Sequence, residues 1–159
     1  MTGDQLVPYP GGIAIGATLL MALLLASVID MRRMILPDWI TLPLIPAGLL
    51  LAQWQVPSLP DRVIGAVLGY GCLAGISALY RRLRHRDGLG LGDAKLFAAA
   101  GAWVGWIGLP SVLLIAAASG LLWALLKRQA LDRPFPFGPF LAIGFWLVWR
   151  FGPLGIDWN

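Results

Sequence analysis

The chain has 159 residues, of which 58% are hydrophobic and 13% charged, and its mean hydropathy is +0.77. A soluble domain of this size could not bury so much apolar surface, so the composition excludes a soluble globular protein and predicts an integral membrane protein. The net charge of +4 does not indicate a nucleic-acid-binding protein, because the basic residues lie in short clusters between hydrophobic runs. We therefore expect the lipid bilayer, and no nucleic acid, among its partners.

Six apolar stretches follow one another along the chain, and a helix needs about 20 such residues to cross the hydrocarbon core. They cover residues 11–30, 39–55, 63–80, 94–108, 111–126 and 137–152. The second stretch contains Pro43 and Pro46, which predict a kinked or tilted helix. Only Leu109 and Pro110 separate the fourth stretch from the fifth. We predict an all-α, polytopic bundle of about six transmembrane helices that forms a single domain over residues 1–159.

The basic residues predict which side of the membrane each loop faces. The first, third and fifth loops between the stretches hold Arg32, Arg33, Arg81, Arg82, Arg84, Arg86, Lys127, Arg128 and Arg133. The alternate loops offer only Arg62. Because positive residues accumulate in cytoplasmic loops, we expect the basic loops in the cytoplasm and both termini on the extracytoplasmic side of the membrane.

Two aspartates reach the same depth of this predicted bundle. Asp30 ends the first stretch and Asp93 precedes the fourth, so both lie at the cytoplasmic edge, although they are 63 residues apart in sequence. Two carboxyl groups close together at low dielectric cannot both ionise cheaply, so one keeps its proton. Such a pair suits acid–base hydrolysis, in which one carboxylate activates water and the other protonates a carbonyl. Gly90 and Gly92 would let the backbone turn sharply and a substrate strand approach.

Each of these acids also has a structural interpretation. Asp93 could cap its helix, and Asp30 could pair with Arg33 at the membrane surface. For Asp38 we favour a helix cap, and for Lys95 a side chain that extends to the lipid headgroups.

Other kinds of site are less compatible with the sequence. The segment "GLGLGDAK" does not have the glycine and lysine spacing of a nucleotide-binding loop, and no predicted strand precedes it. The lone Cys72 excludes an internal disulfide and a cysteine-rich zinc site. Asp61 is interpreted as another helix cap.

Three segments, in this order, resemble those of the type IV prepilin peptidases, polytopic aspartic proteases of the GxGD class. "IDMRRMILPDWITLPL", from Ile29, is similar to the segment of the family's first aspartate. "GLGDAKL", from Gly90, resembles the GxGDxK signature, and "PFPFGPFLAIG", residues 134–144, resembles the C-terminal Pro-Phe-Gly-Pro segment. The three segments together span nearly the whole chain.

The resemblance implies catalytic roles for Asp30 and Asp93. Substrate-site or supporting roles are implied or expected for Asp38, Gly90, Gly92, Lys95, Pro136, Gly138 and Pro139. Residues 136–139 would begin the last helix with an irregular backbone whose unpaired carbonyls meet a substrate strand. The implied substrate is a prepilin or pseudopilin, cut on the cytoplasmic side after a glycine of its leader. We expect no metal and no organic cofactor, because the two acids supply both proton transfers.

The chain differs from the long members of the family, which carry paired cysteines in a cytoplasmic insertion and also N-methylate the new amino terminus. Its first apolar stretch runs directly into the Asp30 segment. We therefore expect peptidase activity without N-methyltransferase activity, as in the short forms. Two alternatives stay open: a small proton- or cation-coupled transporter, which would place acids at mid-membrane, and a catalytically silent assembly factor.

Overall fold

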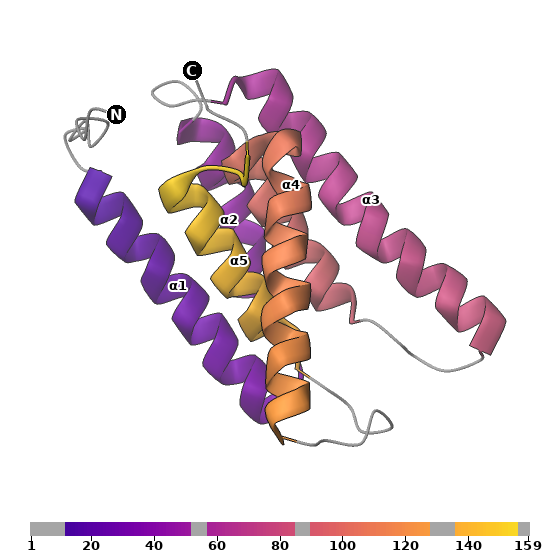
Figure 1. Ribbon diagram of the computed structural model, residues 1–159. Helices are drawn as coiled ribbons and strands as arrows, with labels where there is room; N and C mark the ends of the chain where they lie inside the picture. The colour runs from indigo at the N-terminus through magenta and orange to yellow at the C-terminus, as the bar shows by residue number, and fades with distance from the viewer. Residues whose placement is uncertain (1–11, 52–56, 85–89, 128–135, 156–159) are drawn as a thin grey trace.

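The computed structural model describes residues 12–51, 57–84, 90–127 and 136–155. These stretches form five helices, shown in Figure 1: α1 (Gly12–Arg33), α2 (Asp38–Leu50), α3 (Leu59–Arg84), α4 (Leu91–Lys127) and α5 (Gly138–Phe151). The predicted all-α class is therefore confirmed for the described part of the chain.

The longest helix, α4, reverses direction at Gly105. This glycine has φ 67° and ψ 177°, a combination that is essentially restricted to glycine. The first arm of α4, residues 91–104, packs on α3, where a β-carbon on Gly69 would clash with the carbonyl of Phe97. The second arm, residues 106–127, packs on α5, where a β-carbon on Gly144 would clash with the carbonyl of Val112. Figure 1 shows the two arms running in opposite directions.

The two arms of α4 correspond to the fourth and fifth predicted stretches, but the predicted boundary was wrong. The chain turns at Gly105, whereas Pro110 lies inside the second arm. A turn of this kind needs a positive φ, which glycine adopts without steric cost and proline cannot adopt.

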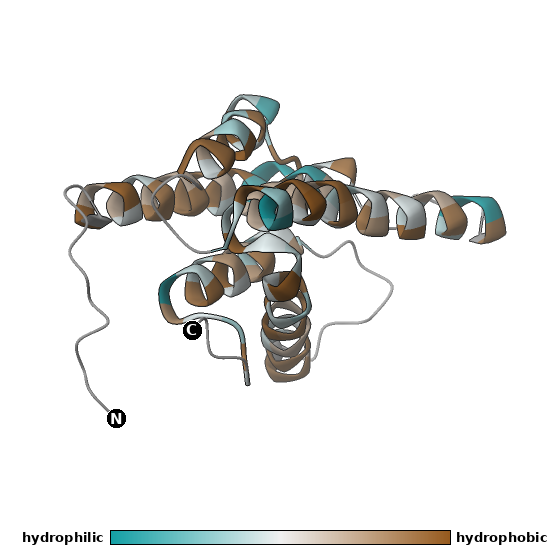
Figure 2. Cartoon of the chain, turned by 90° about the horizontal axis from the view of Figure 1, so that it is seen from above, coloured by the Kyte–Doolittle hydropathy of each residue, from teal (hydrophilic) through white to brown (hydrophobic). Residues whose placement is uncertain are grey.

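Three of the described helices are long and apolar enough to cross a membrane: Ile13–Arg33, Leu59–Leu83 and Leu91–Leu126. The helices α2 and α5 are also apolar but have only 13 and 14 residues. Figure 2 shows hydrophobic residues along every helix, with hydrophilic ones near helix ends such as the end of α3. The multi-pass membrane class is thus supported, while the count of six crossings stays a prediction. Residues 52–55, the end of the second predicted stretch, lie outside the described residues.

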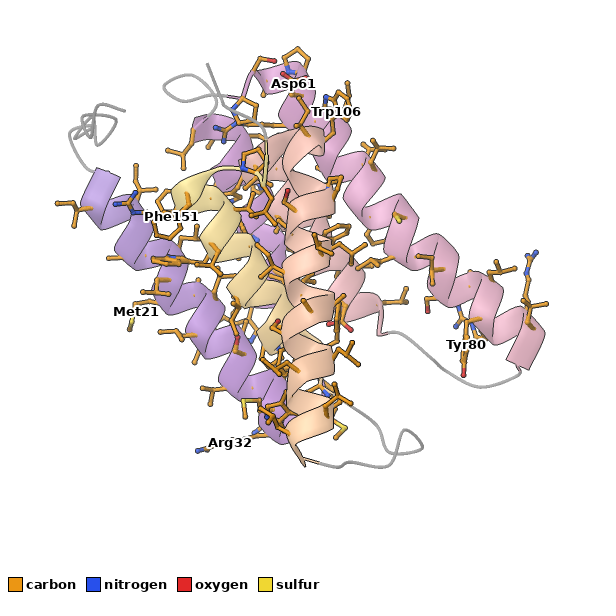
Figure 3. All side chains as sticks on the ribbon, in the orientation of Figure 1. Met21, Arg32, Asp61, Tyr80, Trp106 and Phe151 are labelled. Carbon is orange, nitrogen blue, oxygen red and sulfur yellow. The ribbon has the colours of Figure 1, made fainter. Side chains whose placement is uncertain are left out.

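The bundle has two distinct ends. One end, which we call the aspartate end, contains the last residues of α1 and the first residues of α2, α4 and α5. Arg32 and Arg33 are exposed there, and Figure 3 shows Arg32 pointing out of the bundle. At the opposite end lie the start of α3, the turn at Gly105 and the end of α5. The chain therefore passes up and down between these ends.

Small residues allow the helices to approach closely. A β-carbon on Gly101 of the first arm would overlap the carbonyl group of Gly65 on α3, and one on Gly65 would overlap that of Gly101. Contacts of this kind stabilise membrane helices by close backbone packing.

Candidate active site

Asp30 lies in the last turn of α1, with its side chain turned toward α5. The residue is only 5% exposed, and its Oδ2 accepts a hydrogen bond of 3.1 Å from the backbone N–H of Gly138. Because Gly138 begins α5, this N–H has no partner within the helix, and the positive end of the helix dipole favours a carboxylate there. The alternative pairing of Asp30 with Arg33 is not what the structure shows, since the described residues contain no ion pair between them.

Asp93 is the third residue of α4 and is 9% exposed. The backbone N–H of Gly90 donates to its carboxylate, and the N–H of Asp93 donates to the carbonyl of Gly90 at 3.1 Å. The hydrogen bond from Gly90 supports the interpretation of Asp93 as a helix cap. The carboxyl group of Asp93 also interacts electrostatically with Asp30. Asp93 can therefore cap its helix and interact with the other acid at the same time.

The structure thus brings together the two acids that the sequence placed at one depth. In the described part of the chain, neither carboxyl group forms an ion pair with a cationic side chain. Two buried acids that interact electrostatically without a counter-cation favour a state in which one of them keeps its proton. The arrangement can hold one carboxyl group protonated beside one that is ionised, which is what acid–base hydrolysis requires.

Leu36, which the sequence did not single out, fills the space between the elements that carry the acids. It is buried in the segment between α1 and α2. A β-carbon on Gly92 would lie 2.8 Å from its Cβ, and one on Gly138 would lie 3.3 Å from its Cδ1. These two glycines therefore let Leu36 pack against the starts of α4 and α5. For Gly90, a β-carbon would meet only ordinary contacts.

Asp38 and Lys95 form an ion pair next to the two acids. The Nζ of Lys95 lies 2.6 Å from Oδ1 of Asp38, and the pair is partly exposed. The cap predicted for Asp38 was wrong, because Pro37 takes the N-cap position and Asp38 is the first residue of α2. The predicted extension of Lys95 to the headgroups was also wrong, since the first arm of α4 runs beside α2 and brings Asp38 within reach. The pair ties the start of α2 to the start of α4.

The Pro-Phe-Gly-Pro segment contributes a donor to the site. Pro136 precedes α5, Gly138 begins it, and Pro139 occupies its first turn. The contact with Asp30 is made by the N–H of Gly138, whereas the sequence had suggested a role for carbonyl oxygens in this segment. The reason is that helix starts present free N–H groups and helix ends present free carbonyls.

The opposite end of the bundle contains a second polar cluster, of which the sequence predicted only one member. The hydroxyl of Ser58 donates to Asp61 at 2.5 Å and the backbone N–H of Ser58 also donates to its carboxylate, so the predicted cap at Asp61 is confirmed. The indole Nε1 of Trp106, just after the turn in α4, donates to Asp61 at 3.0 Å. Figure 3 shows Asp61 and Trp106 close together.

Arg62, which was expected as a loop charge, is fully buried. Its Nε donates to the carbonyl of Pro57 at 3.0 Å and one terminal nitrogen donates to the carbonyl of Gly48 at 2.8 Å. A guanidinium group presents five donors, so Arg62 can bind the end of α2 and the chain before α3 at once. No sequence signal distinguishes this arginine from an exposed one.

Within the described residues, no three histidine, cysteine, aspartate or glutamate side chains cluster as metal ligands. Three further residues of types that can bind metals, His85, Asp87 and Asp132, which we interpret as loop residues, lie outside the described residues.

Comparisons with known proteins identify relatives of the chain. The type IV leader peptidase family matches residues 17–125 of the chain. A prepilin leader peptidase/N-methyltransferase of Burkholderia pseudomallei is 49% identical over 141 residues, which is 85% of this chain and 46% of the relative. The proteins of the same name from Aeromonas salmonicida and Escherichia coli K12 are 42% and 48% identical, covering 94% and 74% of this chain and 53% and 54% of their own. The chain thus spans about half the length of the curated relatives it matches. No solved structure matches it.

Proposed function

The chain belongs to the type IV leader peptidase family, and we propose that it is an aspartic endopeptidase that removes the leader peptide of prepilins or pseudopilins. The observation that carries the proposal is that two buried carboxyl groups, Asp30 and Asp93, are close enough to interact electrostatically and have no ion-pair partner among the described residues. The names of the relatives point to the same reaction.

The proposed reaction uses the two acids in opposite protonation states. The ionised carboxylate takes a proton from a water molecule, whose oxygen attacks the peptide carbonyl, while the protonated carboxyl group gives its proton to the carbonyl oxygen. The tetrahedral intermediate then collapses and the C–N bond breaks. The leaving amine takes up a proton from the acid that had accepted one, and the other carboxylate takes the hydroxyl proton of the re-forming carbonyl, so both acids return to their starting states. The N–H of Gly138 keeps the carboxylate of Asp30 in place during these transfers. The two acids supply every proton transfer, so we propose no metal and no organic cofactor.

We further propose that cleavage takes place at the cytoplasmic face of the inner membrane and that the chain crosses this membrane six times. Each arm of α4, together with α1, α2, α3 and α5, would count as one crossing. Exposed arginines at the ends of α1 and α3, Arg32, Arg33, Arg81 and Arg82, support a cytoplasmic aspartate end. Replacing Cys72 with serine and placing single cysteines at Arg32 and Arg150 tests this topology. A membrane-impermeant thiol reagent applied to intact cells should label only position 150.

The lack of N-methyltransferase activity in this chain is also a proposal. It is supported by the single cysteine, Cys72, since the resemblance ties methylation to a segment with paired cysteines. Mass spectrometry of pilin processed by this chain should find an unmodified amino terminus. A methylated terminus in a host without other methyltransferases of this kind would contradict the proposal.

The peptidase proposal is tested by replacing each acid with its amide. Asp30→Asn and Asp93→Asn, co-expressed with a prepilin, should each leave the leader in place, because an amide can neither take nor give the proton. Asp61→Asn is the matched control, since this acid lies at the opposite end of the bundle, and it should process the prepilin normally. Normal processing by both of the first two variants would remove the peptidase proposal and favour the transporter or the silent assembly factor.

A further inference from the structure

An apolar groove lies between α1 and α5, outside the acid pair itself. Its wall on α1 includes Leu20, Leu24 and Ser27, and its wall on α5 includes Pro139, Ile143 and Trp146. Its volume is about 160 Å³, which is room for a few apolar side chains and not for a folded domain. The groove therefore suits a single extended or helical segment laid against the two helices.

The groove has a closed upper end and a lower end at the candidate active site. Above it, α1 and α5 touch, because Gly16 packs against the ring of Trp149. Below it, Ser27 lies one helical turn before Asp30, and Pro139 follows Gly138, which donates its N–H to Asp30. From Pro139 to Trp146 the groove follows α5 for two turns, about 10 Å at 1.5 Å per residue. It therefore leads from Asp30 into the apolar part of the bundle.

The lining presents almost no polar atom to an occupant. The hydroxyl of Ser27 is already bonded to the carbonyl of Leu23 at 2.7 Å, and the indole N–H of Trp146 is itself buried. The groove therefore suits apolar side chains and not charged ones. Its continuity with Asp30 favours a substrate segment over a lipid tail, because a segment joined to a peptide bond at Asp30 is held along this surface.

We infer that this groove receives the apolar segment of the substrate that adjoins the bond cut at Asp30 and Asp93. The inference rests on the proposed peptidase function and adds the surface that positions the substrate. A peptide bond held at the aspartate end has a flank that enters the bilayer, and the groove is an apolar surface that continues from Asp30 in that direction. In lipid there is no hydrophobic force between helices, so binding depends on how well the segment fits the groove.

Filling the groove tests the inference by kinetics. Leu24 lines the groove and is 52% exposed, so Leu24→Trp should add bulk without disturbing the core. We expect the KM for a full-length prepilin to rise about tenfold, with kcat little changed, which corresponds to ~1.4 kcal/mol of lost binding. Met21 lies on the same helix, is 68% exposed and points away from the bundle in Figure 3. The control Met21→Trp should leave KM unchanged.

The possible results separate the groove from the peptidase proposal. If the unaltered chain cleaves no prepilin, the peptidase proposal fails first. If the unaltered chain cleaves the prepilin and Leu24→Trp has the KM of Met21→Trp, the groove is not the docking surface.

A second measurement does not depend on the turnover of a bulky variant. A photo-reactive amino acid at position 24, in the Asp93→Asn background, should cross-link to the apolar segment of a bound prepilin. The same amino acid at position 21 should cross-link mainly to lipid. Cross-links to lipid alone at both positions would overturn the inference.

Discussion

The two ends of the bundle each contain aspartates, and the comparison between them shows which of these acids are suited to chemistry. At the opposite end, Asp61 accepts hydrogen bonds from Ser58 and Trp106, and the nearby Arg62 binds backbone carbonyls. At the aspartate end, Asp30 and Asp93 repel one another, and the described part of the chain supplies each of them with a single backbone N–H.

This difference has a physical meaning. A charged group whose hydrogen bonds are complete stabilises the fold and has little tendency to exchange protons. A pair of like charges that the fold holds together, with few partners, exchanges protons readily and therefore suits catalysis. We expect substitutions at the aspartate end to change activity and substitutions at the opposite end to change stability.

Outside the two acids themselves, the largest effect is expected for Gly138→Ala. The added β-carbon would lie 2.6 Å from Oδ2 of Asp30, so either the carboxyl group or the start of α5 must move. A displacement of about 1 Å in a catalytic group can lower the rate about 10²-fold. Prepilin cleavage should therefore fall by about this factor, as measured by the appearance of the shortened pilin.

Gly71→Ala is the matched control for that variant. A β-carbon on Gly71 meets nothing within 4 Å, and alanine is the better helix former by ~1 kcal/mol. This variant should cleave prepilin normally. If Gly138→Ala also cleaved normally, the contact between Gly138 and Asp30 would have no part in the reaction.

Next in size is Arg62→Met at the opposite end. Methionine keeps much of the volume but leaves the buried carbonyls of Gly48 and Pro57 without this donor, at a cost of about 1–3 kcal/mol for each group left unsatisfied. Thermal unfolding in detergent should occur at a clearly lower temperature, while the folded fraction cleaves prepilin at the normal rate. Arg150→Met, an exposed arginine of α5, should change stability by less than about 0.5 kcal/mol. Equal stability of the two variants would contradict the role of Arg62.

Much of this architecture followed from hydrophobic patterning and charge. The apolar runs predicted α1 and α3, and the clusters of arginine placed Asp30 and Asp93 at one depth. These features are predictable because they depend on general properties of the bilayer. Its thickness sets the length of a crossing helix, and positive residues accumulate on its cytoplasmic side.

The errors concern contacts between segments that are distant in the chain. The partner of Asp38 is Lys95, 57 residues later, and nothing local distinguishes an aspartate that caps a helix from one that pairs across the bundle. The turn in α4 was predicted at Leu109 and Pro110, but it is at Gly105, where a β-carbon would also meet the ring of Pro57. Positive φ and close approach are consequences of the tertiary fold, so glycine content alone could not locate the turn.

A smaller effect is expected for Trp106→Phe, which removes the donor to Asp61 and keeps an aromatic ring. The loss of one hydrogen bond should lower the free energy of unfolding by about 0.5–1.5 kcal/mol. Unfolding of Trp106→Phe, Asp61→Asn and the double variant gives the coupling between the two side chains. Strictly additive losses would show that this contact does not fasten the turn at Gly105 to α3.

The smallest effect is expected for Asp38→Asn. This variant tests whether only Asp30 and Asp93 take part in proton transfer. The Asp38–Lys95 ion pair is partly exposed, and such pairs contribute about 0–1 kcal/mol. Cleavage should stay within about fivefold of normal, and Lys95→Met should have a similar effect, with the double variant no worse than either. Loss of cleavage as complete as in Asp30→Asn, with Lys95→Met still active, would mean that Asp38 takes part in proton transfer itself. The aspartate end would then contain three acids that take part in the reaction. An ion pair and partial exposure, as at Asp38, would no longer be enough to assign an acid there a purely structural role.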